Sequence, residues 1–479
     1  MKSVHHAFIA AGISVATIVG IPGRTVAQNI SVSDTLSVPS NPLFIPTNSE
    51  SIAIKEAASI SLAEALDVAY QNSRELESVL LQLEQSQVSL REAQAAYLPT
   101  LQGTSRLTHS DEDISNEGNL STLDGQPTVN TNLNVDITVN YDIFTFGQRA
   151  ASVRAAQYAV DIQTLQVETV QEEIQLDITN AYYDLQESDE LVRIAEDTVE
   201  QSQISLRDAL ARERAGVGTR FDRLQAEVDL ANDEQTLSNA IRDQNITRRQ
   251  LAELLSLPPG IDLSASDPVE VAGTWELSLE ETLILAYRNR AELEQQLIQR
   301  ELEQQQAKAA RASRWPQLSA FANYRMNDLL DSTRVNADNE TLSAGLQLDW
   351  AIYSGGANRA RARQEIIDAQ LAEVQFADTR EEIRFEAEQQ YLNLGASFKN
   401  IQTATSAVEL AEESLRLARL RFGAGVGIQS DVLESQTRLT EAEVNLVTAI
   451  LDYNRALIGI QRAVSNWPDN NLSANPIRF

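Results

Sequence analysis

The chain has 479 residues, 69 acidic and 38 basic, and a formal net charge of −31 at pH 7. A surface this acidic repels nucleic acid, so we expect no nucleic-acid partner. The sequence has no cysteine, and only His109 of its three histidines lies outside the N-terminal leader described below. These counts exclude disulfides and thiolate chemistry and leave almost no route to a histidine-based metal site or catalytic triad. Since a glycine-rich nucleotide loop is also lacking, we expect no enzyme activity, no metal and no cofactor.

The N-terminus has the pattern of a secretory signal. Lys2 precedes an apolar run from Ala7 to Ile21, and Thr25-Val26-Ala27 fits a cleavage site. We assign residues 1–27 to a signal peptide, with an uncleaved anchor as the alternative. No later stretch reaches the roughly 18 apolar residues of a spanning helix, so any membrane crossing must use strands. Residues 28–58, rich in Ser, Pro and Asn, are expected to be extended or disordered.

Two similar repeats follow, at residues 59–259 and 278–466, joined by a linker at 260–277 and followed by a tail at 467–479. Each repeat reads as a helix, two strands, a long helix, a glycine turn and a return helix. Matching positions include Ala69-Tyr70 and Ala286-Tyr287, Tyr141 and Trp350, Gly147 and Gly356, Tyr182 and Tyr391, and Ala215-Gly216-Val217-Gly218 and Ala424-Gly425-Val426-Gly427.

The first repeat opens with a helix from Ser61 to about Tyr97, broken near Asn72-Ser73. Strands are expected at about 100–110 and 131–144. Apolar and polar residues alternate along the second strand, which places one face in an apolar medium and the other in water. Its length matches the roughly 9–11 residues of a tilted membrane strand. We expect these residues to face lipid: Leu133, Val135, Ile137, Val139 and Tyr141.

The second repeat has the same pattern, with strands expected at about 317–327 and 341–353. The residues expected to face lipid there are Leu342, Leu346, Leu348 and Trp350. Tyr141 and Trp350, near the strand ends, suit an interfacial aromatic belt. A soluble two-sided sheet is the alternative interpretation of both strand pairs.

Each strand pair leads into a long helix, expected at 148–215 and at 357–422. The first of these has no Gly or Pro before Ala215, and the second contains Gly395 alone. At ~1.5 Å per residue, roughly 65 residues give a rod of about 100 Å. Return helices are expected at 221–256 and 429–465, packed against the rods as in coiled coils.

Four strands cannot close a barrel, because their edges would expose unpaired backbone groups to lipid. Several chains must therefore share one barrel, three giving twelve strands and two giving a narrow eight. The helices should then pack side by side into a helical barrel that continues the strand barrel, with a water-filled bore.

The chain resembles the TolC-type outer-membrane efflux family over about residues 60–466. The resemblance rests on motifs that occur twice in the same order. They are Tyr141-Asp142-Ile143-Phe144-Thr145-Phe146-Gly147 and Trp350-Ala351-Ile352-Tyr353-Ser354-Gly355-Gly356, Ala181-Tyr182-Tyr183-Asp184-Leu185 and Gln390-Tyr391-Leu392-Asn393-Leu394, and the turns that lead to Asp222-Arg223-Leu224 and Asp431-Val432-Leu433.

The resemblance implies a mainly α protein with a membrane β-barrel, in which each chain of a homotrimer gives four strands and long coiled-coil helices. It places the barrel in the outer membrane of a Gram-negative-type cell, embedded in lipid, with a long periplasmic extension. It also implies a periplasmic adaptor protein and an inner-membrane RND or ABC pump as partners. The protein would be a passive exit duct that opens by untwisting its helical hairpins.

In such a duct, acids near the periplasmic tip form a constriction. The matching residues here are Asp431, Glu434 and Asp222, with Arg220 as a candidate partner in an ion pair between hairpins. Acids in the first turn of a helix are also favoured by the helix dipole alone, and Arg220 could equally be a solvated side chain. Four glycines permit the tight reversals and are candidates for adaptor docking: Gly216, Gly218, Gly425 and Gly427.

An exported coiled-coil spacer or adhesin without a channel is the alternative function. Such a spacer would not need strands with one apolar and one polar face. The sequence names neither the cargo nor the class of pump.

Overall fold

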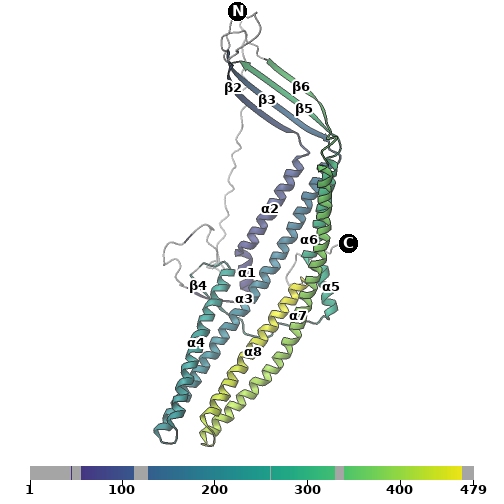
Figure 1. Cartoon of the computed structure of the whole chain (residues 1–479). Helices are drawn as coiled ribbons and strands as arrows, with labels where there is room; N and C mark the ends of the chain where they lie inside the picture. Colours follow the sequence, from purple (N-terminus) through teal and green to yellow (C-terminus); the bar gives the residue numbers. More distant parts are fainter. Residues whose placement is uncertain (1–44, 46–55, 113–127, 259, 330–338, 466–479) are drawn as a thin grey trace, which may run out of the picture.

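The computed structural model describes residue 45 and residues 56–112, 128–258, 260–329 and 339–465. The molecule is elongated, with a sheet at one end and the tips of two helical hairpins at the other (Figure 1). The predicted signal peptide, most of the segment at 28–58, most of both polar loops between paired strands, and the tail at 467–479 lie outside the described residues.

The duplication is visible element by element. The first repeat consists of α1 (Leu62–Asn72), α2 (Arg74–Ala95), β2 (Thr100–Glu112), β3 (Thr128–Phe144), α3 (Gln148–Arg214) and α4 (Arg220–Leu254). The second consists of α5 (Leu279–Asn289), α6 (Ala291–Ala312), β5 (Gln317–Leu329), β6 (Asn339–Asp349), α7 (Ala357–Gly423) and α8 (Gln429–Ala463). Each helix has the same length as its counterpart: 11, 22, 67 and 35 residues in turn.

The same local chemistry starts equivalent helices in the two repeats. Ser61 and Ser278 each form a capping box with the glutamate three residues later, which satisfies backbone N–H groups at the start of α1 and α5. Gly147 and Gly356 precede the long helices with φ of 87° and 88°, in the left-handed region that favours glycine. The chain can therefore turn sharply from a strand into each rod.

The long helices form the frame of the molecule. At ~1.5 Å per residue, the 67 residues of α3 and of α7 extend about 100 Å. Helices α2 and α6 pack beside the halves nearer the sheet, and α4 and α8 beside the halves nearer the tips (Figure 1). We refer to α4 with the adjoining half of α3 as hairpin 1, and to α8 with the adjoining half of α7 as hairpin 2.

A small parallel sheet marks the middle of the molecule. Its two strands are β1 (Glu56–Ile60) and β4 (Ile261–Ala265). Sequence analysis missed both: β1 begins within the segment at 28–58 and β4 lies within the linker at 260–277. Ile60 and Leu263 are buried with residues of α3, α4 and α8, among them Tyr182, Leu251 and Leu451. The main apolar core of the described residues therefore lies at this mid-level.

The larger sheet is antiparallel, with strand order β2-β3-β5-β6. Strand β6 ends at Asp349, four residues before the predicted end at 353, so Trp350 lies beyond the sheet and its assignment as a strand residue was wrong. Asp349 pairs with Gln317, the first residue of β5. The ladder stops there because Pro316, which precedes Gln317, has no N–H to continue the pairing. The Trp350 indole N–H instead donates to the carbonyl oxygen of Arg314 (3.2 Å).

None of the helices in the described residues combines enough length with enough apolar character to cross a membrane.

Candidate functional site: the sheet faces and the hairpin tips

The register of the sheet gathers the predicted lipid-facing residues on one face. Leu133 pairs with Leu107, and Val139 pairs with Leu101 on one side and Ala322 on the other. Across the next ladder, Tyr324 pairs with Leu342, Ala320 with Leu346 and Leu318 with Leu348. Because side chains directly opposite each other in a ladder share a face, the apolar residues of all four strands form one continuous surface. Leu342, Leu346 and Leu348 are exposed on it.

The opposite face of the sheet is polar. The Arg325 guanidinium pairs with the Asp136 carboxylate at 2.7 Å, and the Asn323 amide donates to the Thr138 hydroxyl at 2.9 Å. A shallow cavity of about 490 Å³ opens on this face. It is lined by side chains including Asn140, Phe321, Thr341, Ser343 and Gln347. The sheet can therefore separate an apolar medium from water.

The two hairpin turns have the same backbone geometry. Gly216 and Gly425 have φ of 72° and 77°, where a side chain would be strained. A Cβ on Gly218 would lie 2.8 Å from the Cβ of Arg212, and one on Gly427 would lie 3.0 Å from the backbone nitrogen of Phe422. All four predicted glycines are therefore required by the reversal itself, two by conformation and two by close approach.

Asp222 and Asp431 occupy equivalent positions but have different surroundings. The Asp222 carboxylate accepts hydrogen bonds from the backbone N–H (3.0 Å) and the hydroxyl (2.7 Å) of Thr219, in a capping box. Ile428 takes the place of Thr219 in the second repeat, so α8 has no side-chain cap. Asp431 is thus released from the capping role that holds Asp222.

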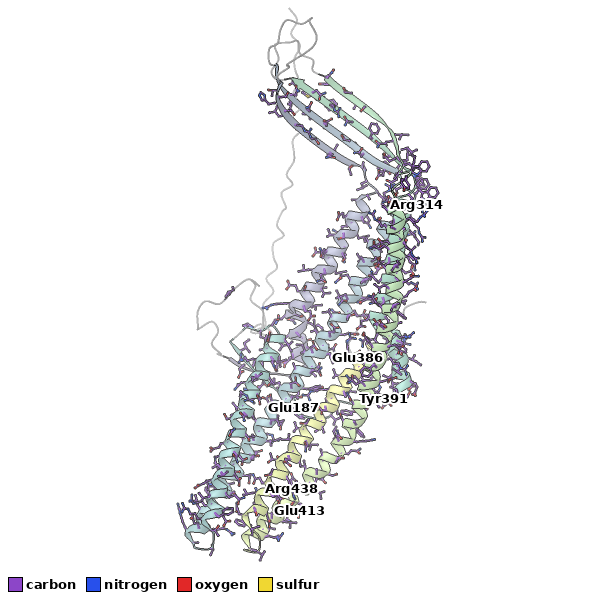
Figure 2. The ribbon with its side chains drawn as sticks, in the orientation of Figure 1. Glu187, Arg314, Glu386, Tyr391, Glu413 and Arg438 are labelled. Carbon is purple, nitrogen blue, oxygen red and sulfur yellow. The ribbon has the colours of Figure 1, made fainter. Side chains whose placement is uncertain are left out.

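The other two predicted gate residues lie in the same region. Arg220 is the exposed first residue of α4. Glu434 is exposed on α8, one turn after Asp431, and pairs with Arg438 of the same helix at 2.6 Å. Figure 2 shows Arg438 near the tip of hairpin 2. The structure therefore brings all four predicted gate residues to the tip region, and it gives ion-pair or capping partners to two of them.

A polar seam that sequence analysis missed joins the two hairpins. The hydroxyls of Thr198 on α3 and Thr440 on α8 lie 3.1 Å apart, and the Arg419 guanidinium on α7 donates to Gln201 on α3 at 2.6 Å. Nearer the tip, Gln429 donates to the hydroxyl of Ser205. Positions 198, 201 and 205 have the spacing of a coiled-coil seam, which is usually apolar. Polar contacts of this kind can be exchanged for hydrogen bonds with water.

Packing inside hairpin 2 is apolar instead. Leu415 and Ala418 of α7 and Val432 of α8 are buried together, with Phe422 and Leu439 against them. The two helices of hairpin 2 are therefore joined by apolar contacts, in contrast to the polar seam between the hairpins.

The tips also expose large apolar side chains. Val217 and Phe221 at hairpin 1 and Val426 and Ile428 at hairpin 2 are 63–76% exposed. Exposed apolar residues gathered at one end of a molecule are typical of a protein contact surface.

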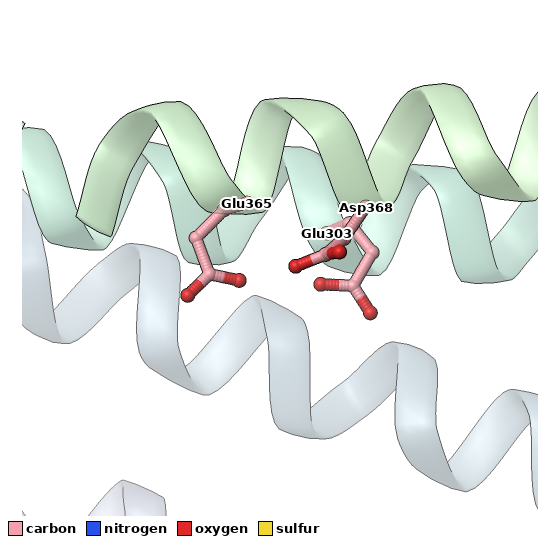
Figure 3. A group of neighbouring side chains, drawn as sticks. All are labelled: Glu303, Glu365 and Asp368. Atoms are coloured by element: carbon pink, nitrogen blue, oxygen red, sulfur yellow. The ribbon is translucent and has the colours of Figure 1, made fainter. Parts of the chain in front are cut away.

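An acidic cluster lies apart from the tips, between α6 and α7. Glu303, Glu365 and Asp368 have carboxylate oxygens within 4.8 Å of one another (Figure 3). Burial raises the pKa of Glu303, a hydrogen bond from Gln299 opposes that change, and the neighbouring acids Glu365 and Asp368 add to it. Carboxylates are ligands of hard cations, but an acidic cluster alone does not define a metal site, and we assign no ion to it.

Comparison with known proteins agrees with this geometry. The sequence matches the family of outer membrane efflux proteins over residues 65–256 and 283–466. Protein CyaE of Bordetella pertussis is 21% identical over 418 residues, covering 87% of this chain and 86% of CyaE. The solvent efflux pump outer membrane protein SrpC of Pseudomonas putida is 22% identical, covering 84% and 85%. The outer-membrane channel OprN has a similar fold, with a TM-score of 0.72 at 16% identity, covering 92% of this chain and 99% of OprN.

Members of this family work with adaptor proteins and inner-membrane pumps in tripartite systems. An exit duct in the outer membrane with a long periplasmic helical part, rather than an exported spacer, accounts for the matched family and for the two-faced sheet. The chain belongs to the outer membrane efflux protein family.

Proposed function

We propose that three copies of this chain form one passive duct, with a twelve-stranded barrel in the outer membrane and a helical tunnel in the periplasm. The single observation that carries the proposal is the four-stranded sheet, which is apolar on one face and polar on the other and ends at β2 and β6. Both outer strands would leave backbone groups unpaired in lipid unless a neighbouring copy pairs with them. Joining β6 of one copy to β2 of the next closes the barrel.

Apolar surfaces on the helices below the sheet support the same arrangement. Helices α2 and α7 lie at opposite flanks of the helical layer, continuing β2 and β6 (Figure 1). Each exposes large apolar side chains at helical spacing: Leu80, Leu81 and Val88 on α2, and Ile367, Leu371, Val374, Phe385 and Leu392 on α7. Packing α7 of one copy against α2 of the next would bury both sets.

The trimer can be tested by the mass of the purified protein in detergent. We expect three copies per particle, and we expect Leu371→Arg to yield smaller particles because it places a charge in the proposed interface. The neighbouring exposed residue Gln370 provides the control, since Gln370→Arg should leave the trimer intact. A wild-type protein that remains monomeric would refute the proposal.

We further propose that the tips close the duct and that Asp431 and Glu434 form its acidic constriction, with Asp222 and Arg220 beside them. Three copies would bring six carboxylates from Asp431 and Glu434 together, and their mutual repulsion favours opening. The duct opens when hairpin 2 moves away from hairpin 1 along the polar seam, because that separation uncovers little apolar surface.

Because the chain has no cysteine, an engineered disulfide can test the opening motion. Thr198→Cys with Thr440→Cys joins the hairpins, and oxidation should hold the channel in its low-conductance state in planar bilayers until a reductant is added. Ser188→Cys with Thr247→Cys is the matched control, because these hydroxyls lie 2.7 Å apart within hairpin 1. Equal conductance of the oxidised and reduced Thr198/Thr440 pair would contradict the opening motion.

The exposed apolar residues at the tips are the proposed docking surface for a periplasmic adaptor protein. The close approach at Gly218 and Gly427 keeps the turns narrow, which would let helices of the adaptor pack between neighbouring hairpins. An inner-membrane pump of the RND or ABC class would supply the energy, and the duct itself would catalyse no reaction. Crosslinking from the native envelope, with Phe221→Asp as the variant expected to lose the adaptor, tests this contact.

A further inference from the structure

A chain of buried charges joins the helices near the middle of the molecule. Arg462, in the last turn of α8, contacts Glu172 of α3 and Glu292 of α6, each at 2.8 Å. Arg290, between α5 and α6, contacts Glu292 at 3.0 Å and Glu386 of α7 at 2.8 Å. We name these five residues the charge cluster; Figure 2 shows Glu386 at this level.

The charge cluster contains one more acid than base. Three carboxyl groups face two guanidinium groups, and an arginine in a protein keeps its charge. The side chains of Arg462 and Glu172 are only 4% and 3% exposed. An unbalanced negative charge is unfavourable there, and uptake of one proton removes it.

The contacts identify which carboxyl group takes the proton. One carboxylate oxygen of Glu292 accepts hydrogen bonds from both Arg290 and Arg462, which stabilises the charged form of Glu292. Glu386 reaches solvent, with 36% of its side chain exposed. Glu172 Oε2 lies 2.8 Å from Nη1 of Arg462 and accepts a hydrogen bond from the Ser465 hydroxyl (3.0 Å). Its Oε1 is buried without a hydrogen-bond partner among the described residues. Glu172 is therefore the carboxyl group with the least support for a charge.

Burial is the largest influence on the pKa of Glu172, and the groups around it act in both directions. Burial raises its pKa to about 7; Arg462 and the Ser465 hydroxyl oppose that change, whereas Glu292 and Glu168 add to it. Glu173, the next residue on α3, and Tyr70 of α1 also lie near, and burial raises the pKa of both groups.

We propose that the charge cluster is a proton-responsive clamp, which fixes the C-terminal end of α8 to α3 while Glu172 is protonated and loosens when Glu172 ionises. Because α8 is the return helix of hairpin 2, the clamp sets how firmly that hairpin is held at its upper end. A carboxyl group with a raised folded-state pKa contributes stability that is complete below its unfolded pKa of about 4.5 and is lost as pH rises through about 7.

Thermal unfolding of the full-length protein in detergent tests the clamp. The midpoint of the wild type should fall by on the order of 5 °C between about pH 5.5 and pH 8. Glu172→Gln imitates the protonated carboxyl group, so its midpoint should stay level across that range and exceed that of the wild type at the higher pH. Glu196→Gln, at an exposed position of the same helix, should follow the wild type.

The same variant, Glu172→Gln, also gives the result that would refute the clamp. If Glu172 is ionised and serves only as an ion-pair partner of Arg462, Glu172→Gln will lower the midpoint at both pH values, and the proposal fails. Hydrogen exchange of wild-type residues Ala456 to Ala463 gives a second measure that needs no variant. After correction for the intrinsic effect of pH, this segment should lose protection at the higher pH relative to α4, and unchanged protection would also refute the clamp.

Discussion

Arg212 of hairpin 1 lies against Phe422 of hairpin 2 through two interactions at once. Its guanidinium carbon is 3.8 Å from the centroid of the Phe422 ring, and its Nη2 donates to the Phe422 carbonyl oxygen at 2.7 Å. The backbone carbonyl oxygen of Arg212 also accepts hydrogen bonds from the N–H groups of Val217 and Gly218 (both 3.0 Å), which close the turn of hairpin 1. One residue therefore shapes its own turn and holds the neighbouring hairpin.

Removing the Arg212 side chain should make the duct open more easily. A cation–π contact contributes about 0.5–2 kcal/mol and a hydrogen bond about 1 kcal/mol, so Arg212→Ala should weaken the closed state by roughly 1–3 kcal/mol per copy. Single-channel recordings should show more time at high conductance. Arg214→Ala, at an exposed position two residues further on, is the control, and similar traces from the two variants would contradict the role of Arg212.

The contact between Arg212 and Phe422 could not be found in the sequence, because nothing in either repeat indicates that position 212 meets position 422. Arg212 and Arg421 occupy equivalent positions, and the carbonyl oxygen of each accepts two N–H groups of its own turn. The side chain of Arg212 differs in reaching across to Phe422 of the other repeat. The same reason hid the charge cluster, whose members come from distant parts of the chain. What the sequence does show is local: the alternation of Leu133 to Tyr141 predicts two faces, and the register places them as expected.

Strand ends and short strands were harder to predict from the sequence, because they depend on pairing with a distant partner strand as well as on the local pattern. The alternation that ends at Ile352 continues past the last paired residue, Asp349, because pairing depends on the partner strand and its preceding proline. Strand β1 has the sequence Glu-Ala-Ala-Ser-Ile, in which no strong alternation distinguishes a strand from a loop. Its position is set by pairing with β4, far along the chain.

The two equivalent acids near the tips should respond differently to substitution. Asp222→Ala removes half of a capping box and should lower stability by about 1 kcal/mol, with a smaller effect on ion selectivity. Asp431→Asn should change stability little and reduce the preference for cations, because it removes a charge from the proposed constriction. Thermal unfolding and reversal potentials in a salt gradient measure the two effects, and the hypothesis fails if Asp222→Ala shifts the reversal potential more than Asp431→Asn does.

Substitutions at neighbouring residues of one strand should also have different effects, because the two side chains lie on opposite faces of the sheet. Ile137→Lys places a charge on the apolar face and should cost about 2–4 kcal/mol if that face is in the middle of the bilayer. Thr138→Lys places the same charge on the polar face, where Thr138 accepts from Asn323, and should mainly alter conductance. The amount of folded protein extracted from membranes and its conductance would show the contrast; equal loss of folded protein would argue against a lipid-facing surface.

The stability that Glu292 contributes should depend on pH in the opposite way to that of Glu172, although both residues belong to the charge cluster. Burial acts to raise the pKa of Glu292, but Arg290 and Arg462 outweigh it and lower the pKa to about 2. Its ionised form therefore contributes stability above about pH 4.5, and that contribution is lost as pH falls towards 2. Glu292→Gln would leave two buried guanidinium groups without their shared partner, a change that typically costs 3–5 kcal/mol.

The comparison of Glu292→Gln with Glu172→Gln is informative at pH 7 to 8, where the two variants remove a carboxyl group from the same cluster. We expect Glu292→Gln to unfold at a much lower denaturant concentration than the wild type and Glu172→Gln to unfold at the same concentration or a higher one. Position gives the reason, since either change leaves two carboxyl groups facing two guanidinium groups. Glu292 pairs with both arginines, whereas Glu172 pairs with Arg462 alone and has one buried oxygen without a partner among the described residues. If both variants lose stability equally, the surplus charge must reside elsewhere among the acids around Arg462, with Glu168 and Glu173 the nearest candidates.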